Sequence, residues 1–324
     1  MSTAALPLRD PRAAQGAPRS EKPMNPAFAL ALRVPLHGLG LLVAALPRRA
    51  EIALGRLLGR LALAVDAKRR RIARDNVRRC LPELGPAGWD ALLRDNYEHY
   101  GILTLELLHL FAPIPGHWRA YALRTARLEG LENWRAANDK GRGALFCSAH
   151  LANWELMSAA GALAGIPITI VTRRLKPEWL HRWMERTRRS VGVRAVYQPR
   201  TMPGVLRGLR DGASVGFVMD QYMPPPMGKP LRFFGVRVDT LTAIAPLARR
   251  TGAPITPVSQ RRGADGVVVV AIEPEFALGA DDDADNQRLS DLVEGWVRAM
   301  PDQWLWAHRR FKNVNWSDND DERP

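Results

Sequence analysis

The chain has 324 residues, 46% of them hydrophobic and 25% charged, which is enough apolar material for a packed core and excludes an intrinsically disordered chain. Its 47 Lys and Arg residues outnumber its 33 Asp and Glu residues and give a net charge of +14, so we expect a negatively charged partner: nucleic acid, an anionic membrane surface, a phosphorylated ligand or an acidic carrier protein. Two cysteines, Cys80 and Cys147, lie far apart in the chain, which excludes a disulfide scaffold and a Cys-rich zinc site.

The N-terminal part divides into an extension and a long apolar stretch. Residues 1–25 are rich in Pro, Ala and Arg, lack the apolar core of a secretory signal, and are expected to be a flexible extension. The stretch from Phe28 to Leu46 is mostly apolar and about long enough to cross a hydrocarbon core of roughly 30 Å. Arg33, Pro35 and His37 disfavour a full span. The sequence therefore predicts a membrane anchor or half-inserted helix, with a buried amphipathic helix as the alternative.

The next segment combines a helical apolar repeat with dense positive charge. From Arg48 to Arg79, eleven basic residues stand against three acidic ones, a net of +8. Leu, Ile and Ala recur at helical spacing, so one face of the helix is apolar and the other is cationic. This pattern is typical of a helix that lies on an anionic membrane surface, although a solvated helix face is the alternative. A further helical pattern extends from Pro86 to about Leu123, so we predict a helical, membrane-associated region over 26–125.

From about Arg127, short β-rich runs alternate with helical stretches. The candidate strands begin at Gly143, Pro167, Val193, Ala213, Ala253 and Gly266. Helical stretches among them begin at Asn153, Pro177 and Leu241. This alternation predicts an α/β domain over 126–316 with a mixed, largely parallel sheet flanked by helices. Residues 317–324 are expected to be an acidic, solvated tail.

The stretch ALFCSAHLANWEL, from Ala144 to Leu156, carries the first candidate site. An apolar run that predicts a buried strand ends at His150, and Glu155 follows in the first turn of a predicted helix. In α/β proteins, ligands gather at the carboxyl ends of the strands. A helix that begins near Asn153 would direct free backbone N–H groups into the same space, where an anion or a developing oxyanion would be stabilised.

The spacing of His150 and Glu155 adds a geometric condition. Five residues place the two side chains about 140° apart on a continuous helix, so they can meet only if the chain turns between Leu151 and Trp154. A carboxylate bonded to the imidazole would fix its tautomer and leave the other nitrogen free to act as a general base. The alternative is a satisfied buried histidine followed by an ordinary acidic first turn.

Other catalytic patterns are missing from the sequence. It contains no Gly-x-Ser-x-Gly elbow, no Gly-rich phosphate loop with a following Lys, and no His-Glu-x-x-His metal motif. A histidine and a carboxylate without a protein nucleophile favour direct transfer of a group between two substrates, in which a hydroxyl of one substrate is the nucleophile. We therefore expect neither a metal nor a cofactor.

A second basic region extends from Arg173 to Arg210, with eleven basic residues against two acidic ones, a net of +9. Guanidinium groups bind phosphate through two parallel hydrogen bonds, so Arg173 and Arg174 are candidate substrate-binding residues. Nucleic-acid binding is the rival interpretation. However, Trp179 and Trp183 are spaced as a helical packing stripe, and no nucleic-acid-binding motif is present.

Several segments in a fixed order resemble one family, the late (secondary) acyltransferases of lipid A biosynthesis in Gram-negative bacteria. The resemblance covers about residues 46–312 and rests on RRRIARDNVRRCLPEL, LEGLENWRAANDKGRGALFCSAHLANWEL with its His-x-x-x-x-Glu box, DQY from Asp220, FFGVRVDTLTAIAPLARRTGAPITP and PDQWLWAHRRFK. It implies a glycerolipid-acyltransferase-like fold and an enzyme on the cytoplasmic face of the inner membrane. Such an enzyme moves a fatty acyl chain from acyl-carrier protein to a hydroxyl of a phosphorylated, acylated glucosamine disaccharide.

The resemblance also implies roles for single residues. His150 and Glu155 would form the catalytic box, Asp220 would be a further site residue, and Arg188 and Arg189 would lie near the sugar phosphates. Two alternatives stay open: a related acyltransferase that acts on another glycolipid or an aminolipid, and a basic membrane- or nucleic-acid-binding protein without chemistry.

Overall fold

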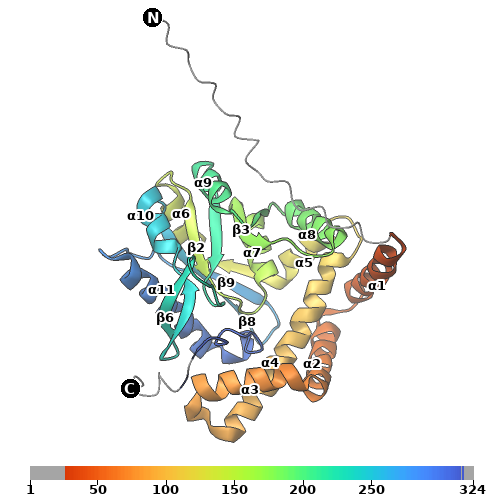
Figure 1. Cartoon of the computed structure of the whole chain (residues 1–324). Helices are drawn as coiled ribbons and strands as arrows, with labels where there is room; N and C mark the ends of the chain where they lie inside the picture. The colour runs from red at the N-terminus through yellow and green to blue at the C-terminus, as the bar shows by residue number, and fades with distance from the viewer. Residues whose placement is uncertain (1–25, 315, 317–324) are drawn as a thin grey trace, which may run out of the picture.

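The computed structural model describes residues 26–314 and 316. The expected N-terminal extension and acidic tail lie outside these residues. Five α-helices precede the first strand in the described part: α1 (Pro26–Ala44), α2 (Arg48–Val65), α3 (Ala67–Cys80), α4 (Gly85–Leu108) and α5 (His117–Thr125). Figure 1 shows α1 to α4 on one side of the sheet region.

Within the described chain, seven strands form one sheet in the order β1-β9-β8-β2-β5-β3-β4. Their bounds are β1 (Ala126–Glu129), β2 (Ala144–Ser148), β3 (Ile168–Arg173), β4 (Arg194–Gln198), β5 (Ser214–Val218), β8 (Ile255–Arg262) and β9 (Val268–Ile272). Neighbouring strands pair in parallel except β8 and β9. The predicted mixed, largely parallel sheet is confirmed, and each candidate strand of the sequence corresponds to one of its members.

Helices flank this sheet, as expected for an α/β layer. After β1 they are α6 (Leu131–Asn138), α7 (Trp154–Leu163), α8 (Glu178–Ser190), α9 (Met202–Arg210), α10 (Ile244–Thr251) and α11 (Asp282–Ala299). A separate antiparallel hairpin joins β6 (Gly228–Phe233) to β7 (Val236–Leu241). The hairpin and β1 are not among the strands that the sequence predicts, because β1 has four residues and the hairpin carries Lys, Arg and Asp among its apolar residues.

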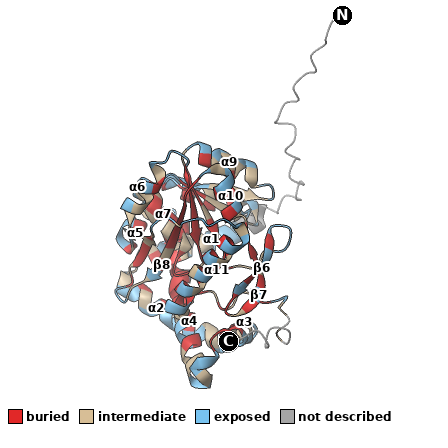
Figure 2. Ribbon diagram, turned by 90° about the vertical axis from the view of Figure 1, so that its left-hand side faces the viewer, coloured by how far each residue is buried: buried red, intermediate tan, exposed pale blue. Residues whose placement is uncertain are grey.

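The central strand β2 shows how the two layers are built. Ala144 and Phe146 belong to one core cluster with side chains of α5, α7 and α8, whereas Leu145 and Cys147 belong to another with α9, α10 and α11. Successive residues of a strand point to opposite faces. A strand covered on both sides is therefore apolar throughout, and Figure 2 shows the sheet buried within the molecule.

Helix α1 lies against the rest of the molecule along one side. The Nδ1 atom of His37 is 2.8 Å from the backbone oxygen of Phe111, and the His37 ring lies 4.1 Å from that of Trp183 on α8. No helix in the described part of the chain is both long and apolar enough to cross a membrane. The predicted apolar helix is present, and its role as an anchor stays a prediction.

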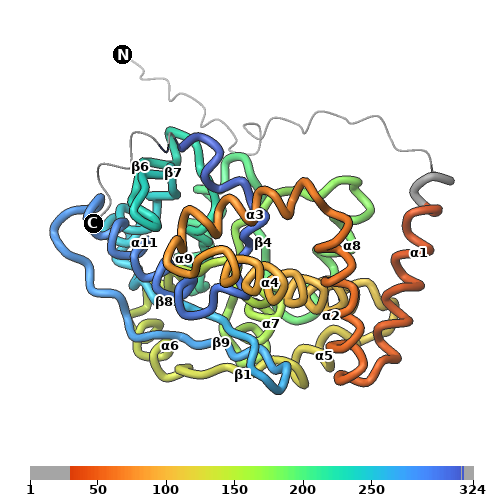
Figure 3. Tube along the Cα trace, turned by 90° about the horizontal axis from the view of Figure 1, so that it is seen from below, coloured from red at the N-terminus to blue at the C-terminus, as the bar shows by residue number. Residues whose placement is uncertain are grey.

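Helices α2 and α4 run side by side and approach closely through glycines (Figure 3). A Cβ atom at Gly101 would lie 1.9 Å from the backbone oxygen of Gly55, and one at Gly59 would lie 2.1 Å from that of Tyr97. Larger residues cannot occupy these positions unless the helices separate. The contact holds α2 in place against α4, which in turn packs on the α/β domain.

We expect Gly101→Ala to destabilise the protein, because the added methyl group forces α2 away from α4. Overpacking of this kind costs about 1–3 kcal/mol of unfolding free energy, which thermal or denaturant unfolding would measure. Gly38→Ala on α1 is the matched control, since a Cβ there meets nothing within 4 Å. Equal stability of the two variants would contradict the close packing of α2 and α4.

Candidate active site

The predicted turn between His150 and Glu155 is present. Strand β2 ends at Ser148 and α7 begins at Trp154. Between them the backbone of Ala152 has a φ of 42°, in the left-handed region that non-glycine residues rarely adopt. The chain therefore reverses at the carboxyl end of a central strand, where α/β folds place their ligands.

Asp220, directly after β5, is the carboxylate that holds His150. Its Oδ1 is 2.8 Å from Nδ1 of the imidazole, and its Oδ2 accepts a hydrogen bond of 2.9 Å from the backbone N–H of His150. The indole N–H of Trp304 donates to the same Oδ2 at 2.9 Å. Strands β2 and β5 pair in parallel with Ser148 opposite Val218, so their following residues meet. The arrangement fixes the tautomer and leaves Nε2 as the nitrogen that can exchange a proton.

The environment of His150 shifts its pKa upward. Burial alone lowers the pKa of the imidazole, but the charge and hydrogen bond of Asp220, followed by the charge of Glu155, outweigh it and raise the pKa above 6.5. In return, His150 and Trp304 hold the pKa of the Asp220 carboxyl well below its usual range, although burial opposes this. His150 can therefore act as a base, with the Asp220 carboxylate held as an anion on its other ring nitrogen.

The expectation that Glu155 binds the imidazole is wrong. The Glu155 carboxylate is paired with Arg188 of α8, with Nε to Oε2 at 3.0 Å and Nη2 to Oε1 at 2.5 Å. Both side chains are largely buried, with 6% and 10% exposure. A guanidinium provides two parallel donors for one carboxylate, and this fit outcompetes the single nitrogen of an imidazole. Glu155 still acts on His150 through its charge.

Asn153 is the N-cap of α7. Its Oδ1 accepts hydrogen bonds of 3.1 Å from the backbone N–H groups of Glu155 and Leu156. Such caps satisfy backbone donors that a helix leaves unpaired. These two N–H groups are therefore already bonded, and an oxyanion site made of other backbone N–H groups near Asn153 stays a prediction.

An apolar cavity lies beside His150, Glu155 and Arg188, which all line it. Its volume is about 140 Å³, and its apolar wall includes Phe146, Ile166, Ile168, Val218, Val258 and Val270. Along β3 it reaches from Thr172 back to Ile168, four residues or about 13 Å at 3.3 Å per residue. The cavity thus runs from the turn between β2 and α7 along the sheet, and its length and apolar lining suit an alkyl chain.

The exposed arginines predicted as substrate ligands lie outside this cavity. Arg173 bonds to Gln198 at 3.2 Å, Arg174 pairs with Glu178, and Arg189 pairs with Glu185. None of the three lines the cavity, so Arg188 is the predicted basic residue that the fold brings to His150. Because Arg188 is committed to Glu155, its contact with a phosphate stays a prediction, as do those of the other three.

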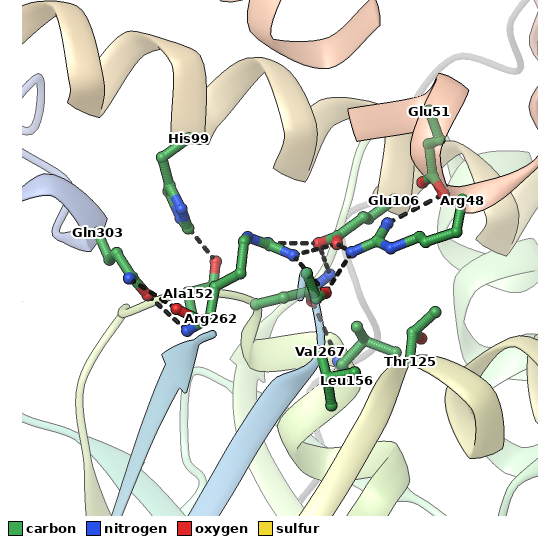
Figure 4. A network of polar contacts seen from close by, with 12 residues as sticks. Arg48, Glu51, His99, Glu106, Thr125, Ala152, Leu156, Arg262, Val267 and Gln303 are labelled. Carbon is green, nitrogen blue, oxygen red and sulfur yellow. Dashed lines mark hydrogen bonds and ion pairs between the residues drawn. The ribbon is translucent and has the colours of Figure 1, made fainter. Parts of the chain in front are cut away.

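A buried polar network that the sequence did not reveal supports the turn from the other side (Figure 4). Glu106 of α4 pairs with Arg262 of β8 and with Arg48 of α2. His99 contacts the backbone oxygen of Ala152 at 3.2 Å. No local pattern could identify these residues, because each resembles an ordinary polar position on its own helix or strand. Among the described residues, no group of three or more His, Cys, Asp or Glu side chains is arranged to hold a metal ion.

Comparison with known proteins identifies the family of the chain. A family model described as bacterial lipid A biosynthesis acyltransferase matches residues 32–313, which include the whole site. The chain belongs to this family. It is an acyltransferase, and this assignment contradicts the alternative of a basic binding protein without chemistry.

Relatives of the acyltransferase carry more specific names. It is 27% identical over 301 residues to the lipid A biosynthesis lauroyltransferase of Escherichia coli (strain K12), covering 89% of this chain and 95% of the relative. The palmitoleoyltransferase of the same strain is 26% identical over 265 residues, covering 80% and 84%. The phosphatidylinositol mannoside acyltransferase of Mycolicibacterium smegmatis is 28% identical over 176 residues, covering 52% and 57%.

We predict that histidine NMR of the acyltransferase shows a pKa above 6.5 for His150. Because the pKa is higher in the folded than in the unfolded chain, protonation of His150 contributes stability below about pH 6.5 that is lost as the pH rises through the folded pKa. In Asp220→Asn, burial should dominate and the pKa of His150 should fall. His117, whose pKa is lowered by burial and by His109, is the internal control and should not move. An unchanged His150 titration in the variant would contradict the pairing.

Proposed function

We propose that the acyltransferase moves a fatty acyl chain from acyl-carrier protein to a hydroxyl of a phosphorylated, acylated glucosamine disaccharide, a lipid A precursor. The observation that carries the proposal is the His150–Asp220 pair, which opens on an apolar cavity along the sheet. The names of the E. coli relatives, which refer to lipid A biosynthesis, support a lipid A precursor as the acceptor. The charge of +14 complements both an acidic carrier protein and a phosphorylated lipid.

In this mechanism the acyl chain of the donor occupies the cavity between α7 and the sheet. Each methylene group that leaves water contributes about 0.8 kcal/mol to binding, so the apolar wall holds the thioester carbonyl near His150. The acceptor hydroxyl attacks this carbonyl while Nε2 of His150 takes its proton. The C–O bond then forms, the C–S bond breaks, and the thiolate of the carrier receives the proton from the imidazolium. No cofactor takes part.

Glu155 and Arg188 act as a second unit in the proposal. Arg188 lines the cavity, so its guanidinium is the positive group that stabilises the oxyanion, a role that the capped backbone N–H groups cannot fill. Glu155 holds this guanidinium in place through two hydrogen bonds. His150 and Glu155 thus remain the proposed catalytic pair, although each acts with a partner from another segment. Arg173, Arg174 and Arg189 are proposed to bind the phosphates at the rim.

We further propose that α1 and α2 dock on the cytoplasmic face of the inner membrane. Large apolar side chains are exposed on both helices: Leu30, Leu32, Val34, Leu39, Leu41 and Leu42 on α1, and Leu54, Leu57, Leu58, Leu61 and Val65 on α2. Those of α2 recur at steps of three and four, which places them on one face. Arg56 and Arg60 lie near Glu98 of α4, with N–O distances of 3.9 and 2.6 Å, but both side chains stay more than half exposed and would add attraction to anionic headgroups.

We predict that His150→Ala lowers the rate of acyl transfer from acyl-carrier protein by about 10²- to 10⁴-fold, which is the range that general base help supplies. Glu155→Gln should also lower the rate, because it weakens the hold on Arg188, and Glu132→Gln on the exposed surface of α6 is the matched control. In a deletion strain, mass spectrometry should show lipid A that lacks one acyl chain. The wild-type gene and the control should restore it, and His150→Ala should not.

The same spectra test the second candidate, a related acyltransferase of another glycolipid, which the mannoside acyltransferase relative favours. Loss of an acyl chain from a different glycolipid in the deletion strain would support it. Unchanged lipids in the deletion strain, or full activity of both active-site variants, would contradict the proposed function.

We predict that replacing Leu57 and Leu61 together by Asp weakens binding to vesicles that contain anionic phospholipid by at least about tenfold, since burial of one Leu side chain contributes about 1.5–3 kcal/mol. Both are more than half exposed, at 52% and 54%. Leu278→Asp, at an exposed position before α11, is the control and should bind like the wild type. Co-sedimentation measures the binding, and equal binding of all three proteins would contradict docking through α2.

A further inference from the structure

Glu106 of α4 is a fully buried carboxylate at the centre of a network that reaches three other segments. Arg262 donates to both of its oxygens, with Nη2 to Oε2 at 2.7 Å. Arg48 of α2 donates to Oε1 at 2.5 Å. Asn153, the cap of α7, donates its amide to Oε2 at 2.8 Å. Figure 4 shows Arg48 and Arg262 converging on Glu106 between α2, α4 and the sheet.

The network is electrically balanced. Arg48 also pairs with Glu51 at 2.9 Å, so two guanidinium groups face two carboxylates. Burial alone would raise the pKa of Glu106, but the charges of Arg262 and Arg48 hold it below its usual value, and the group stays ionised. Buried ion pairs contribute little net stability, because removing both charges from water costs about as much as their attraction returns. Stability therefore does not explain why the charges are there.

The contact with Asn153 gives the network a direct effect on the catalytic turn. The amide oxygen of Asn153 caps α7 through the N–H groups of Glu155 and Leu156, while its NH₂ group faces Glu106. A rotated amide would place its oxygen against the carboxylate and its NH₂ group against two N–H donors, which is unfavourable on both sides. Glu106 therefore selects the orientation in which Asn153 caps the helix.

Arg262 extends the support to Ala152, the residue with the left-handed backbone. The backbone N–H of Ala152 donates to the oxygen of Gln303 at 3.2 Å, and the side chain of Gln303 accepts from the backbone N–H of Arg262 at 2.7 Å. His99 contacts the oxygen of Ala152, and burial together with Arg262 lowers the pKa of His99 to about 3. His99 is thus a neutral donor at neutral pH. An unfavourable backbone conformation persists only where its surroundings hold it.

We propose that Glu106 is a positioning residue for acyl transfer. Through Asn153 and Arg262 it holds the turn from His150 to Glu155 in its reactive geometry, and Arg48 ties that turn to α2. Glu106 does not line the cavity, so it acts on the reaction through these partners. The inference rests on the proposed acyl transfer.

A double-mutant cycle tests the proposal. Glu106→Gln keeps the shape of the side chain and removes its charge, and Asn153→Ser keeps a capping oxygen but cannot reach Glu106. Each single variant should lower kcat of the purified, folded enzyme by about 10- to 100-fold, because small displacements of reacting groups have effects of this size. If Glu106 acts through Asn153, the double variant should be no slower than the slower single variant.

Asp285→Asn is the matched control. Asp285 is also a buried carboxylate between two arginines, Arg249 and Arg288, each at 3.0 Å, but it lies on α11 and has no contact with the turn. It should lower the melting temperature and leave kcat unchanged. Glu106 is not among the groups that shift the pKa of His150. In a plot of kcat against pH, Glu106→Gln should therefore fall at the same acidic pH as the wild type, and only its maximum kcat should be lower.

Three outcomes would overturn the proposal: kcat of Glu106→Gln equal to that of the wild type, losses that multiply in the double variant, or an equal loss in Asp285→Asn. If Glu106→Gln fails to fold, Asn153→Ser decides alone, since a variant with wild-type stability and wild-type kcat would show that the contact has no positioning role. Failure of the proposed function is distinguishable, because the wild-type enzyme itself would then transfer no acyl chain.

Discussion

The structure around the turn between β2 and α7 depends on one constraint: a carboxylate that is removed from water must be paired with a cation and with hydrogen-bond donors. The side chains of Asp220, Glu155 and Glu106 are all at most 6% exposed, and each meets a cationic or protonatable group from a distant segment. These pairs join β2 to β5, α7 to α8, and α4 to both β8 and α2. The turn is the point where the three pairs meet, so its geometry follows from their simultaneous formation.

Much of the fold could be predicted because it depends on local patterns. The apolar runs that form β2, β3 and β5 are covered on both faces, and such strands are recognisable from composition. The turn between Leu151 and Trp154 follows from the predicted junction of a buried strand with a helix. By contrast, β1 has only four residues, too few to show an alternation of apolar and polar residues. The hairpin of β6 and β7 contains Lys, Arg and Asp, which obscure its apolar side.

The partners within the site could be predicted only in part. His150, Glu155 and Asp220 are identified by the sequence or by the family resemblance, but the pairing of His150 with Glu155 was wrong. Sequence proximity favoured Glu155, five residues away, whereas the true partner lies 70 residues away, just after a strand that pairs with β2. Which carboxylate meets which cation depends on the register of the sheet and on the placement of α8, and neither is encoded near the turn. Glu106 was missed for the same reason.

Trp304 donates to Asp220, Gln303 binds Ala152, and Leu151 forms a bridge with Trp304. The segment that completes the site therefore lies near the C-terminal end of the described chain, more than 150 residues after the turn it supports. During synthesis, the turn leaves the ribosome long before this segment exists, and contacts of such high sequence separation form late in folding. An unfinished or C-terminally truncated chain would contain His150, Glu155 and Asp220 but lack the support of their geometry. The site therefore takes its shape only after the segment that carries Gln303 and Trp304 has been synthesised and has packed against the turn.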